Sequence, residues 1–202
     1  MAHCAHIPAF VLHQVTCQFA TGQTLFGPLS VSLEPSLCGL VGRNGVGKTR
    51  LLRLLAGLDS PAGGHIERAA AVAWVAQQPT LTPETTLATL LGYASVFAAL
   101  SRLEQGQGLA DDFDLLDGHW DLTDRLSLVF READLPPFSA DRPAFSLSGG
   151  ERMKALLCGA FVSGADYLLL DEPTNYLDRQ GREWLYHQLE SWQGGALIAS
   201  HD

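Results

Sequence analysis

The sequence predicts an α/β fold whose core is a parallel β-sheet. Two continuous apolar runs, 37–41 and 167–170, have the pattern of strands that are buried in such a sheet, the first of them on both faces. The first run is followed by a glycine-rich loop and then by leucines at helical spacing. With 202 residues, of which 47% are hydrophobic and 17% charged, the chain suits one domain, with or without a subdomain.

Composition and charge exclude several classes of protein. The net charge of −9 argues against a surface that is basic throughout, as nucleic-acid-binding proteins have, although a local basic patch stays open. No apolar run approaches the about 18 to 20 residues that cross a bilayer, and the first residues lack the pattern of a secretory signal. We therefore expect a soluble, cytoplasmic protein.

The cysteines and the first histidines predict neither a disulfide framework nor a metal site. The cysteines form no C-x-x-C pair and are scattered along the chain, at Cys4, Cys17, Cys38 and Cys158. Three histidines lie near the start of the chain, at His3, His6 and His13. We expect ordinary surface histidines there, because no carboxylate partner lies nearby in the sequence.

The glycine-rich loop after the first buried strand is the strongest local signal. It matches the pattern G-x-x-x-x-G-K-[ST] and consists of Gly42, Arg43, Asn44, Gly45, Val46, Gly47, Lys48 and Thr49. Glycines let backbone N–H groups surround phosphate oxygens, and the N-terminus of the following helix adds a partial positive charge. Lys48 can reach the β and γ oxygens, and Thr49 offers a hydroxyl to Mg²⁺. The loop therefore predicts binding of a nucleoside triphosphate.

Antiparallel strands and helices are expected on either side of this loop. An antiparallel β portion before it includes 10–19 and 29–33. A helical subdomain is predicted at about 82–144, between core segments 1–81 and 145–202 of a single domain, because its apolar residues keep an approximate helical spacing. Six aspartates lie between its helices, at Asp111, Asp112, Asp114, Asp117, Asp121 and Asp124. We interpret them as a solvated acidic linker.

A further helix begins with small polar residues. Ser148, Gly149 and Gly150 precede apolar residues that recur at helical spacing from Met153 to Phe161. The start of this helix would present N–H groups, the Ser148 hydroxyl and a positive dipole end to whatever lies in front of it.

Two adjacent carboxylates follow the second buried strand. Asp171 and Glu172 come directly after the run 167–170, at the strand end where open α/β sheets bind ligands. Two such groups can have different roles, with Asp171 holding Mg²⁺ through water and Glu172 orienting or deprotonating the attacking water. Together with the glycine-rich loop, they indicate a nucleoside triphosphate hydrolase.

These motifs, in this order, resemble those of ATP-binding cassette (ABC) ATPases, a group of P-loop NTPases, over essentially the whole chain. The matching segments are Gly42 to Thr49 for Walker A, Leu147 to Glu151 for the signature, Leu168 to Glu172 for Walker B and Asn175 to Asp178 for the D-loop. Gln77 stands at the place of the Q-loop glutamine and Phe19 at that of the aromatic residue that stacks on adenine. Gln78 and Phe10 are alternatives for these two roles.

The resemblance implies a mechanism with two cassettes. Two such domains sandwich two ATP molecules, so that the signature residues Ser148, Gly149, Gly150 and Glu151 would reach the γ-phosphate held by the partner's Walker A loop. It implies that Thr49, Gln77 and Asp171 hold Mg²⁺ and that Glu172 activates water. One copy of the chain alone would not complete a site.

The sequence leaves three interpretations of the type of cassette open. The run DEPTNYLD is similar to that of the soluble, tandem-cassette ABC-F type, whose better-known members act on the ribosome, with Tyr176 where His is usual. The path of about thirty residues from Lys48 to Gln77 also favours this type, because it leaves room for only one small strand pair. The acidic stretch weighs against ribosomal RNA as a direct partner of the helical subdomain. The ATPase subunit of a membrane transporter and a non-hydrolytic nucleotide switch are the alternatives.

The last residues supply one more motif. An apolar run from Ala196 to Ala199 predicts a further core strand, and His201 after it matches the H-loop histidine. In the family this histidine contacts the γ-phosphate and helps to orient the catalytic glutamate. We expect the chain to be the first cassette of a longer protein, truncated after this motif.

Overall fold

The computed structural model of the chain describes residues 7–19 and 21–201, which form two compact units. Unit 1 takes its described residues from Met1–Gln77, Gly164–Asn175 and Leu189–Asp202, and unit 2 consists of Gln78–Ser163 and Tyr176–Gln188. Unit 2 therefore contains the helix after Ser148, whereas the sequence prediction ends the helical subdomain at 144. His3, Cys4 and His6 lie outside the described residues.

An antiparallel sheet opens unit 1, as the sequence predicts. Its strands are β1 (Phe10–Gln18), β2 (Thr24–Leu33) and β4 (Gly63–Arg68), in the order β2-β1-β4. Residues of β1 alternate in burial, and Phe10 and Leu12 reach the core. This alternation is what a strand needs when only one face of its sheet is covered.

The second sheet of unit 1 is parallel throughout. It consists of β3 (Leu37–Val41), β5 (Val72–Val75), β6 (Tyr167–Asp171) and β7 (Gly195–Ser200), in the order β3-β7-β6-β5. All five residues of β6 are buried, because strands flank it on both sides. The prediction of an α/β fold with a parallel core sheet is therefore confirmed.

Two expectations about these strands were wrong. Leu37 and Val41 of the edge strand β3 are 51% and 67% exposed, although the apolar run predicts burial on both faces. They alternate along the strand with the half-buried Cys38 and Leu40, so one face of β3 is uncovered. The strands β4 and β5 do not form the small strand pair that the sequence indicates. Instead β4 pairs with β1 in the antiparallel sheet and β5 pairs with β6 in the parallel one.

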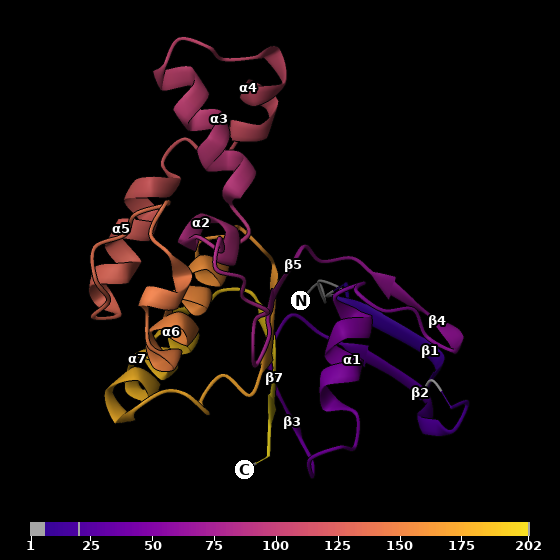
Figure 1. Ribbon diagram of the computed structural model, residues 1–202. Coiled ribbons are helices and arrows are strands. Elements are labelled where there is room, and N and C mark those ends of the chain that lie inside the picture. The colour runs from indigo at the N-terminus through magenta and orange to yellow at the C-terminus, as the bar shows by residue number, and fades with distance from the viewer. Residues whose placement is uncertain (1–6, 20, 202) are drawn as a thin grey trace, which may run out of the picture. The chain divides into compact units, whose positions relative to one another are not determined.

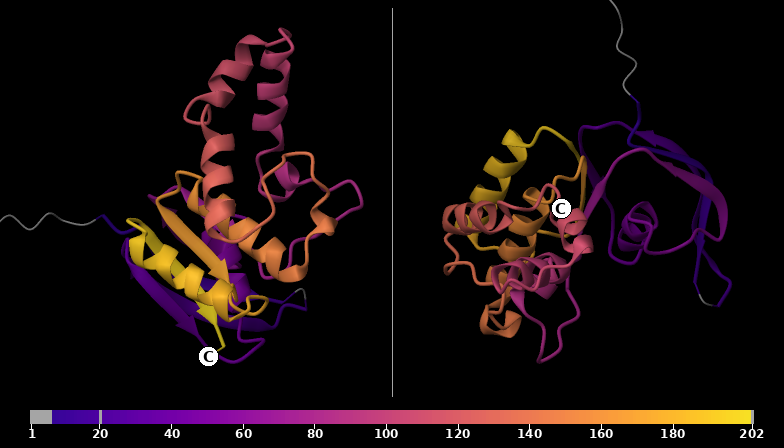
Figure 2. Two further views of the ribbon diagram at one scale, coloured as in Figure 1. Left: turned by 90° about the vertical axis from the view of Figure 1, so that its left-hand side faces the viewer. Right: turned by 90° about the horizontal axis from the view of Figure 1, so that it is seen from above.

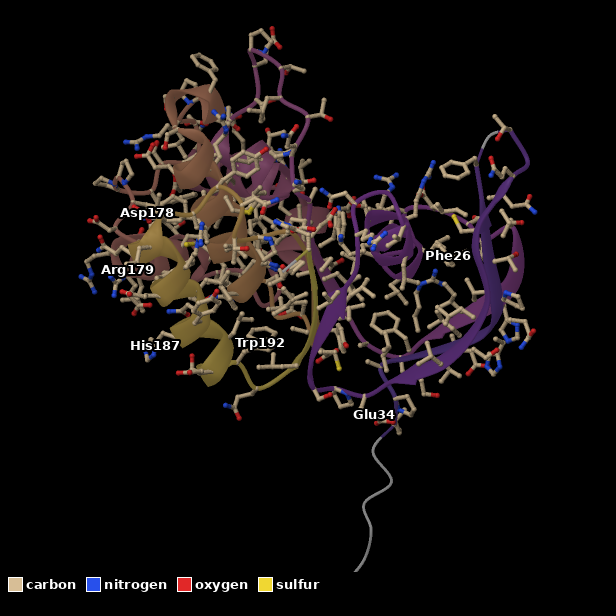
Figure 3. The ribbon with its side chains drawn as sticks, turned by 90° about the horizontal axis from the view of Figure 1, so that it is seen from below. Phe26, Glu34, Asp178, Arg179, His187 and Trp192 are labelled. Atoms are coloured by element: carbon tan, nitrogen blue, oxygen red, sulfur yellow. The ribbon has the colours of Figure 1, made fainter. Side chains whose placement is uncertain are left out.

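Helix α1 (Lys48–Leu55) lies between the two sheets of unit 1 (Figure 1 and Figure 2). Leu52, Leu54 and Leu55 are fully or almost fully buried and join one hydrophobic core with residues from both sheets. Phe26 of β2 packs against the same core (Figure 3). The helix that follows the glycine-rich loop is thus fixed by apolar contacts on two sides.

The loop after α1 is tied to that helix by Asp59. Its carboxylate accepts two hydrogen bonds from Arg53, each 2.9 Å long, and one of 2.8 Å from Arg50. The bonds from Arg53 hold the pKa of Asp59 at about 2, against an ordinary value of 3.8. A lowered pKa means that the carboxylate stabilises the fold above about pH 4 and loses this effect as the pH falls towards 2.

Replacing Asp59 with Asn should therefore lower the stability of the chain in a pH-dependent way. We expect a fall in Tm of about 2–4 °C at pH 7, since the pair is partly exposed to solvent. Thermal melts followed by circular dichroism from pH 7 down to pH 3 measure this difference. The difference in Tm between the two proteins should become smaller below about pH 4. A difference that stays constant would contradict the assignment of this effect to the ionised Asp59.

Unit 2 is mainly helical. Its helices are α2 (Leu87–Leu90), α3 (Ala94–Glu104), α4 (Ala110–Leu116), α5 (Leu122–Glu132), the 3₁₀ helix η1 (Ala144–Ser146), α6 (Gly149–Phe161) and the part of α7 (Arg179–Ser191) up to Gln188. Figure 1 shows α3 beside α4. The buried side chains of Leu116, Leu126 and Phe130 belong to one core that is separate from that of unit 1.

The acidic stretch is not the linker that the sequence predicts. Three of its aspartates lie in α4, and Asp112 is only 3% exposed. Asp112 accepts two hydrogen bonds from Arg102 and one of 2.9 Å from the backbone N–H of Leu109. One aspartate therefore fixes α4 against α3, while the other five are exposed.

No helix among the described residues is long and apolar enough to span a membrane.

Candidate nucleotide site

A pocket of about 360 Å³ in unit 1 gathers most of the predicted site residues. Its lining consists of Phe19, Leu25, Asn44, Gly45, Gly47, Lys48, Thr49, Arg50, Gln77, Glu172, Asn175 and His201. These residues come from the segment after β1, from β2, from the glycine-rich loop and the start of α1, and from the segments that follow β5, β6 and β7. Sequence segments far apart in the chain thus meet at the carboxyl ends of parallel strands, where α/β sheets place their ligand sites.

Gly47 allows the loop to turn into α1. It has a φ of 105° and caps the helix without a side-chain hydrogen bond. A Cβ at this position would lie 2.8 Å from Cδ1 of Phe26. The sequence therefore needs glycine here both for the left-handed backbone and for the close approach of β2. The free N–H groups of the first turn of α1 are left for an anion.

Lys48 is buried at the floor of the pocket. Its ammonium donates a 2.6 Å hydrogen bond to the carbonyl of Gly42 and lies 3.3 Å from a carboxylate oxygen of Glu172. Only 7% of each of these two side chains is exposed. Lys48 is thus held at the glycine-rich loop by Gly42 and lies beside the carboxylate of Glu172.

Thr49 and Asp171 form the part of the site suited to a cation. The hydroxyl of Thr49 donates a 2.7 Å hydrogen bond to Oδ2 of Asp171. The other oxygen, Oδ1, is buried and makes no hydrogen bond. Burial raises the pKa of Asp171, and the hydrogen bond from Thr49 offsets part of this. A buried carboxylate oxygen without a donor is what a Mg²⁺ ion or a water bound to it would satisfy.

Glu172 lies next to Lys48 and His201. Its Oε2 is 2.7 Å from Nδ1 of His201, and its backbone N–H donates a 3.0 Å hydrogen bond to the carbonyl of Ala199. Burial alone would raise the pKa of Glu172, but the hydrogen bonds from His201 and Lys48 outweigh it and lower the pKa. Glu172 is therefore ionised at neutral pH, as a group that accepts a proton must be.

The backbone of Glu172 is unusual for its residue type. It has a φ of 50°, in the left-handed region that few residues other than glycine, asparagine and aspartate adopt. The turn that follows Asp171 requires this conformation, and the carbonyl of Glu172 accepts a 3.2 Å hydrogen bond from Asn175. Such strained positions are frequent where a side chain must point at a ligand.

The structure distinguishes between the alternative aromatic and glutamine residues. Phe19 is 47% exposed and lines the pocket, whereas Phe10 is fully buried and packs edge-on against Tyr167 at 5.0 Å. Gln77 also lines the pocket, whereas the side-chain amide of Gln78 donates a hydrogen bond to the Tyr176 hydroxyl. Phe10 and Gln78 are therefore engaged elsewhere.

The helix after Ser148 belongs to unit 2 and does not contribute to this lining. The Ser148 hydroxyl accepts a 3.3 Å hydrogen bond from the backbone N–H of Glu151, and a carboxylate oxygen of Glu151 accepts one of 2.7 Å from that of Ser148. This reciprocal pair is a capping box, and it fixes the first turn of α6. Gly150 packs close to Tyr176, because a Cβ there would lie 2.8 Å from its carbonyl oxygen.

Three lining residues are not among the predicted site residues: Leu25, Asn175 and Arg50, the last of which follows Thr49 in α1. Leu25 on β2 and Asn175 after Glu172 both face the pocket. Asn175 stands in a motif that the sequence already singles out, but nothing in its residue type distinguishes it from its neighbours. Leu25 carries no signal of a site, because one apolar residue in a strand is usually there for packing.

Several known proteins are similar to this chain. The family model described as ABC transporter matches residues 27–175. The chain is 33% identical over 218 residues to the energy-dependent translational throttle protein EttA of Mycobacterium tuberculosis (strain ATCC 25618 / H37Rv), which covers 98% of this chain and 36% of that protein. It is 36% identical over 207 residues to the ATP-binding protein Uup of Caulobacter vibrioides, covering 100% of this chain and 29% of that protein. The chain thus spans about a third of the length of these curated relatives.

The fold is found among solved structures as well. A structure titled "Structure of ATP binding subunit of ABC transporter" superposes with a TM-score of 0.69 at 21% identity, and the match covers 96% of this chain and 79% of that one. At this identity the likeness concerns the fold alone. The family model, in contrast, covers well over half of the chain and includes the glycine-rich loop, α6 and the carboxylates of Asp171 and Glu172 at the end of β6. The chain therefore belongs to the ATP-binding cassette family, whose model is described as ABC transporter.

Proposed function

We propose that the chain binds MgATP and hydrolyses it when a second cassette completes the site. The observation that carries this proposal is the cluster formed by Glu172, Lys48 and His201 in one pocket, with Thr49 and Asp171 beside them. A lysine from a phosphate loop, a cation site and an ionised carboxylate are the groups that hydrolysis of a nucleoside triphosphate requires.

The loop 42–49 would hold the phosphate groups. Its backbone N–H groups and the start of α1 offer donors and a partial positive charge, and Lys48 adds a full charge. Phe19 is the exposed aromatic residue of the pocket and would stack on the adenine ring.

Thr49, Asp171 and Gln77 would hold Mg²⁺. The donor set fits, because it consists of oxygen ligands and includes the unpaired buried Oδ1 of Asp171. When bound, the ion neutralises negative charge on the phosphates.

Glu172 would act on the attacking water. The water oxygen forms a bond to the γ-phosphorus as the bond from this phosphorus to the bridging oxygen breaks, and ADP leaves. Glu172 orients this water and accepts its proton, for which the lowered pKa keeps it ionised. His201 holds the carboxylate in place through its 2.7 Å contact.

The second cassette would supply the start of α6. The positive end of this helix and the residues Ser148, Gly149, Gly150 and Glu151 lie in unit 2 and do not line the pocket. A helix N-terminus with glycines suits a γ-phosphate bound to another cassette. The partner cassette is either a second copy of the chain or a further cassette of the same protein.

We propose the ABC-F type for this chain, with the ribosome as the partner that ATP turnover acts on. Support comes from the run DEPTNYLD and from the 33% identity to EttA, which is named a translational throttle protein. Five exposed aspartates around α4 and α5 would repel RNA phosphates, so contact with the ribosome would involve another surface. The alternative is the ATP-binding subunit of a transporter.

Dimerisation tests the pairing of cassettes. With Glu172→Gln and MgATP, we expect a shift from monomer to dimer in size-exclusion chromatography with light scattering, because slowed hydrolysis traps the sandwiched state. ADP should give no shift, and neither should the double variant Glu172→Gln/Lys48→Ala, which lacks the phosphate ligand. A chain that stays monomeric with ATP would rule out pairing with a second copy of itself.

Co-sedimentation tests the partner. The Glu172→Gln variant with ATP is centrifuged through a sucrose cushion with purified ribosomes. Recovery in the pellet only with ATP supports the proposed ribosomal role. Equal recovery with and without nucleotide, or none, contradicts a role of this chain on the ribosome and leaves the transporter subunit as the better assignment.

A further inference from the structure

Three side chains that could bind a metal ion meet on the antiparallel sheet of unit 1, apart from the residues of the nucleotide pocket. They are His13 of β1 and His65 and Glu67 of β4. We propose that they form a site for a divalent transition-metal ion such as Zn²⁺. Two imidazoles and one carboxylate are a ligand set that zinc accepts, with a fourth position filled by water.

The strand pairing brings the three residues together. His13 stands directly opposite His65 in the register of β1 and β4, and Glu67 follows His65 by two residues. Residues two apart on a strand point to the same face, so both β4 side chains share a face with their cross-strand neighbour. On β1, residues Leu12 and Val15 face the core, which leaves His13 on the outer side of the sheet.

The backbone at this point is specialised. The pairing register shifts after His13, at a β-bulge that includes Gln14 with a φ of 50°. Gly64 opposite has a φ of 78°, and a Cβ there would lie 2.3 Å from the carbonyl oxygen of His13. Only glycine allows β4 to approach this closely, and bulges of this kind re-aim the side chains next to them.

The distances suit coordination of one ion. Nε2 of His13 lies 3.2 Å from Oε1 of Glu67, and Nε2 of His65 lies 3.7 Å from the same oxygen. The ligand atoms of all three residues lie within 4.8 Å of one another. A tetrahedral zinc ion with bonds of about 2.0–2.1 Å spaces its ligands about 3.3–3.4 Å apart. Small side-chain rotations would therefore bring all three ligands onto the ion.

One ligand atom lacks a hydrogen bond. The His13 side chain is 44% exposed, but its Nε2 atom is buried and lies 3.2 Å from Oε1 of Glu67 without hydrogen-bond geometry. The two imidazole rings lie nearly parallel, with their centroids 4.4 Å apart and their planes tilted by 16°. The side chains of His65 and Glu67 are 65% and 64% exposed, so an ion and a water can reach the site from solvent. An ion bound between His13 and Glu67 would coordinate this buried nitrogen in place of its present 3.2 Å contact with the carboxylate.

The sequence alone argues against this site. His13 has no carboxylate near it in the sequence, and we therefore expected an ordinary surface histidine. The fold supplies the missing carboxylate from β4, far along the chain. The weak signal in the sequence is His65-x-Glu67, because this spacing puts two ligands on one face of a strand.

Metal binding in solution tests the proposal. The full chain is used with His3→Ala, Cys4→Ser and His6→Ala, so that these other donors do not contribute. Zn²⁺ is titrated in competition with a chromophoric chelator, and Co²⁺ is added separately to record its absorption spectrum. We expect one equivalent of bound zinc and the strong visible bands of a four-coordinate cobalt site.

Variants assign the ion to these residues. His13→Ala, His65→Ala and Glu67→Gln should each weaken Zn²⁺ binding at least about 10-fold, since each removes one ligand. His119→Ala in unit 2 is the matched control and should change the affinity by less than about 2-fold. Affinities in all three variants equal to that of the background chain would overturn the proposal, and so would the absence of zinc binding in that chain.

A second readout keeps the test independent of folding. Zn²⁺ should raise Tm of the background chain, because it binds the folded state and joins β1 to β4, and should leave Tm of Glu67→Gln nearly unchanged. In ¹⁵N spectra of labelled histidine, the Nε2 signals of His13 and His65 should shift together with zinc. Shifts confined to other histidines, such as His201 in the nucleotide pocket, would contradict the assignment.

Discussion

Replacing Glu172 with Gln is expected to slow ATP hydrolysis by about 10²- to 10⁴-fold and to leave ATP binding nearly unchanged. Gln keeps the shape of the side chain but cannot accept a proton from water. The hydrogen bond from His201 and the packing around this 7% exposed side chain can persist, whereas the charge next to Lys48 is lost. Single-turnover assays with radiolabelled ATP, at protein concentrations that support pairing, measure the rate.

The control for this change is Glu183→Gln. Glu183 lies in α7, pairs with Arg179 and is 63% exposed, so its replacement removes one carboxylate without touching the pocket. The control should hydrolyse ATP at the rate of the unchanged chain. Turnover that is the same in Glu172→Gln and in the control would remove Glu172 from the role of base.

Replacing Lys48 with Ala is expected to weaken nucleotide binding by about 10- to 100-fold or more. The ammonium would make charged hydrogen bonds to the phosphates, and such bonds contribute about 1.5–3 kcal/mol each. Titration calorimetry with a slowly hydrolysed ATP analogue and Mg²⁺ measures the affinity. Equal affinity in the variant and the unchanged chain would contradict the assignment of the loop to phosphate binding.

Arg179→Ala is the matched control for Lys48. It also removes one positive charge, but its side chain is 93% exposed and lies outside the pocket. Its affinity for the analogue should equal that of the unchanged chain.

The double variant Lys48→Ala/Glu172→Gln should be more stable than Lys48→Ala alone, because Lys48→Ala leaves the buried carboxylate of Glu172 with one partner fewer.

The parts of the site that are local in sequence could be predicted without the structure. The loop 42–49, the carboxylates at 171 and 172 and the cap at Ser148 follow from short patterns whose geometry depends on a few neighbouring residues. The structure places them on the elements that these patterns indicate. The two alternatives, Phe10 and Gln78, were separated only by their surroundings in the fold.

The parts that depend on distant residues could not be predicted in this way. The exposure of Val41 follows from the uncovered face of β3, which the sequence of this strand does not encode. Asp112 is buried because Arg102 stands opposite on α3, and this pairing was not visible in a run of aspartates. The approach of Glu67 to His13 likewise depends on strand register.

The capping box at the start of α6 has a consequence for how cassettes would associate. Glu151 places its own carboxylate at the helix end that would meet a phosphate, where it accepts a hydrogen bond from Ser148. A phosphate that arrives there does not fill a bare positive end, since an anion is already present. A phosphate bound there would be attracted by the helix end and repelled by the Glu151 carboxylate, and the free energy of the proposed association would be the difference between these two effects.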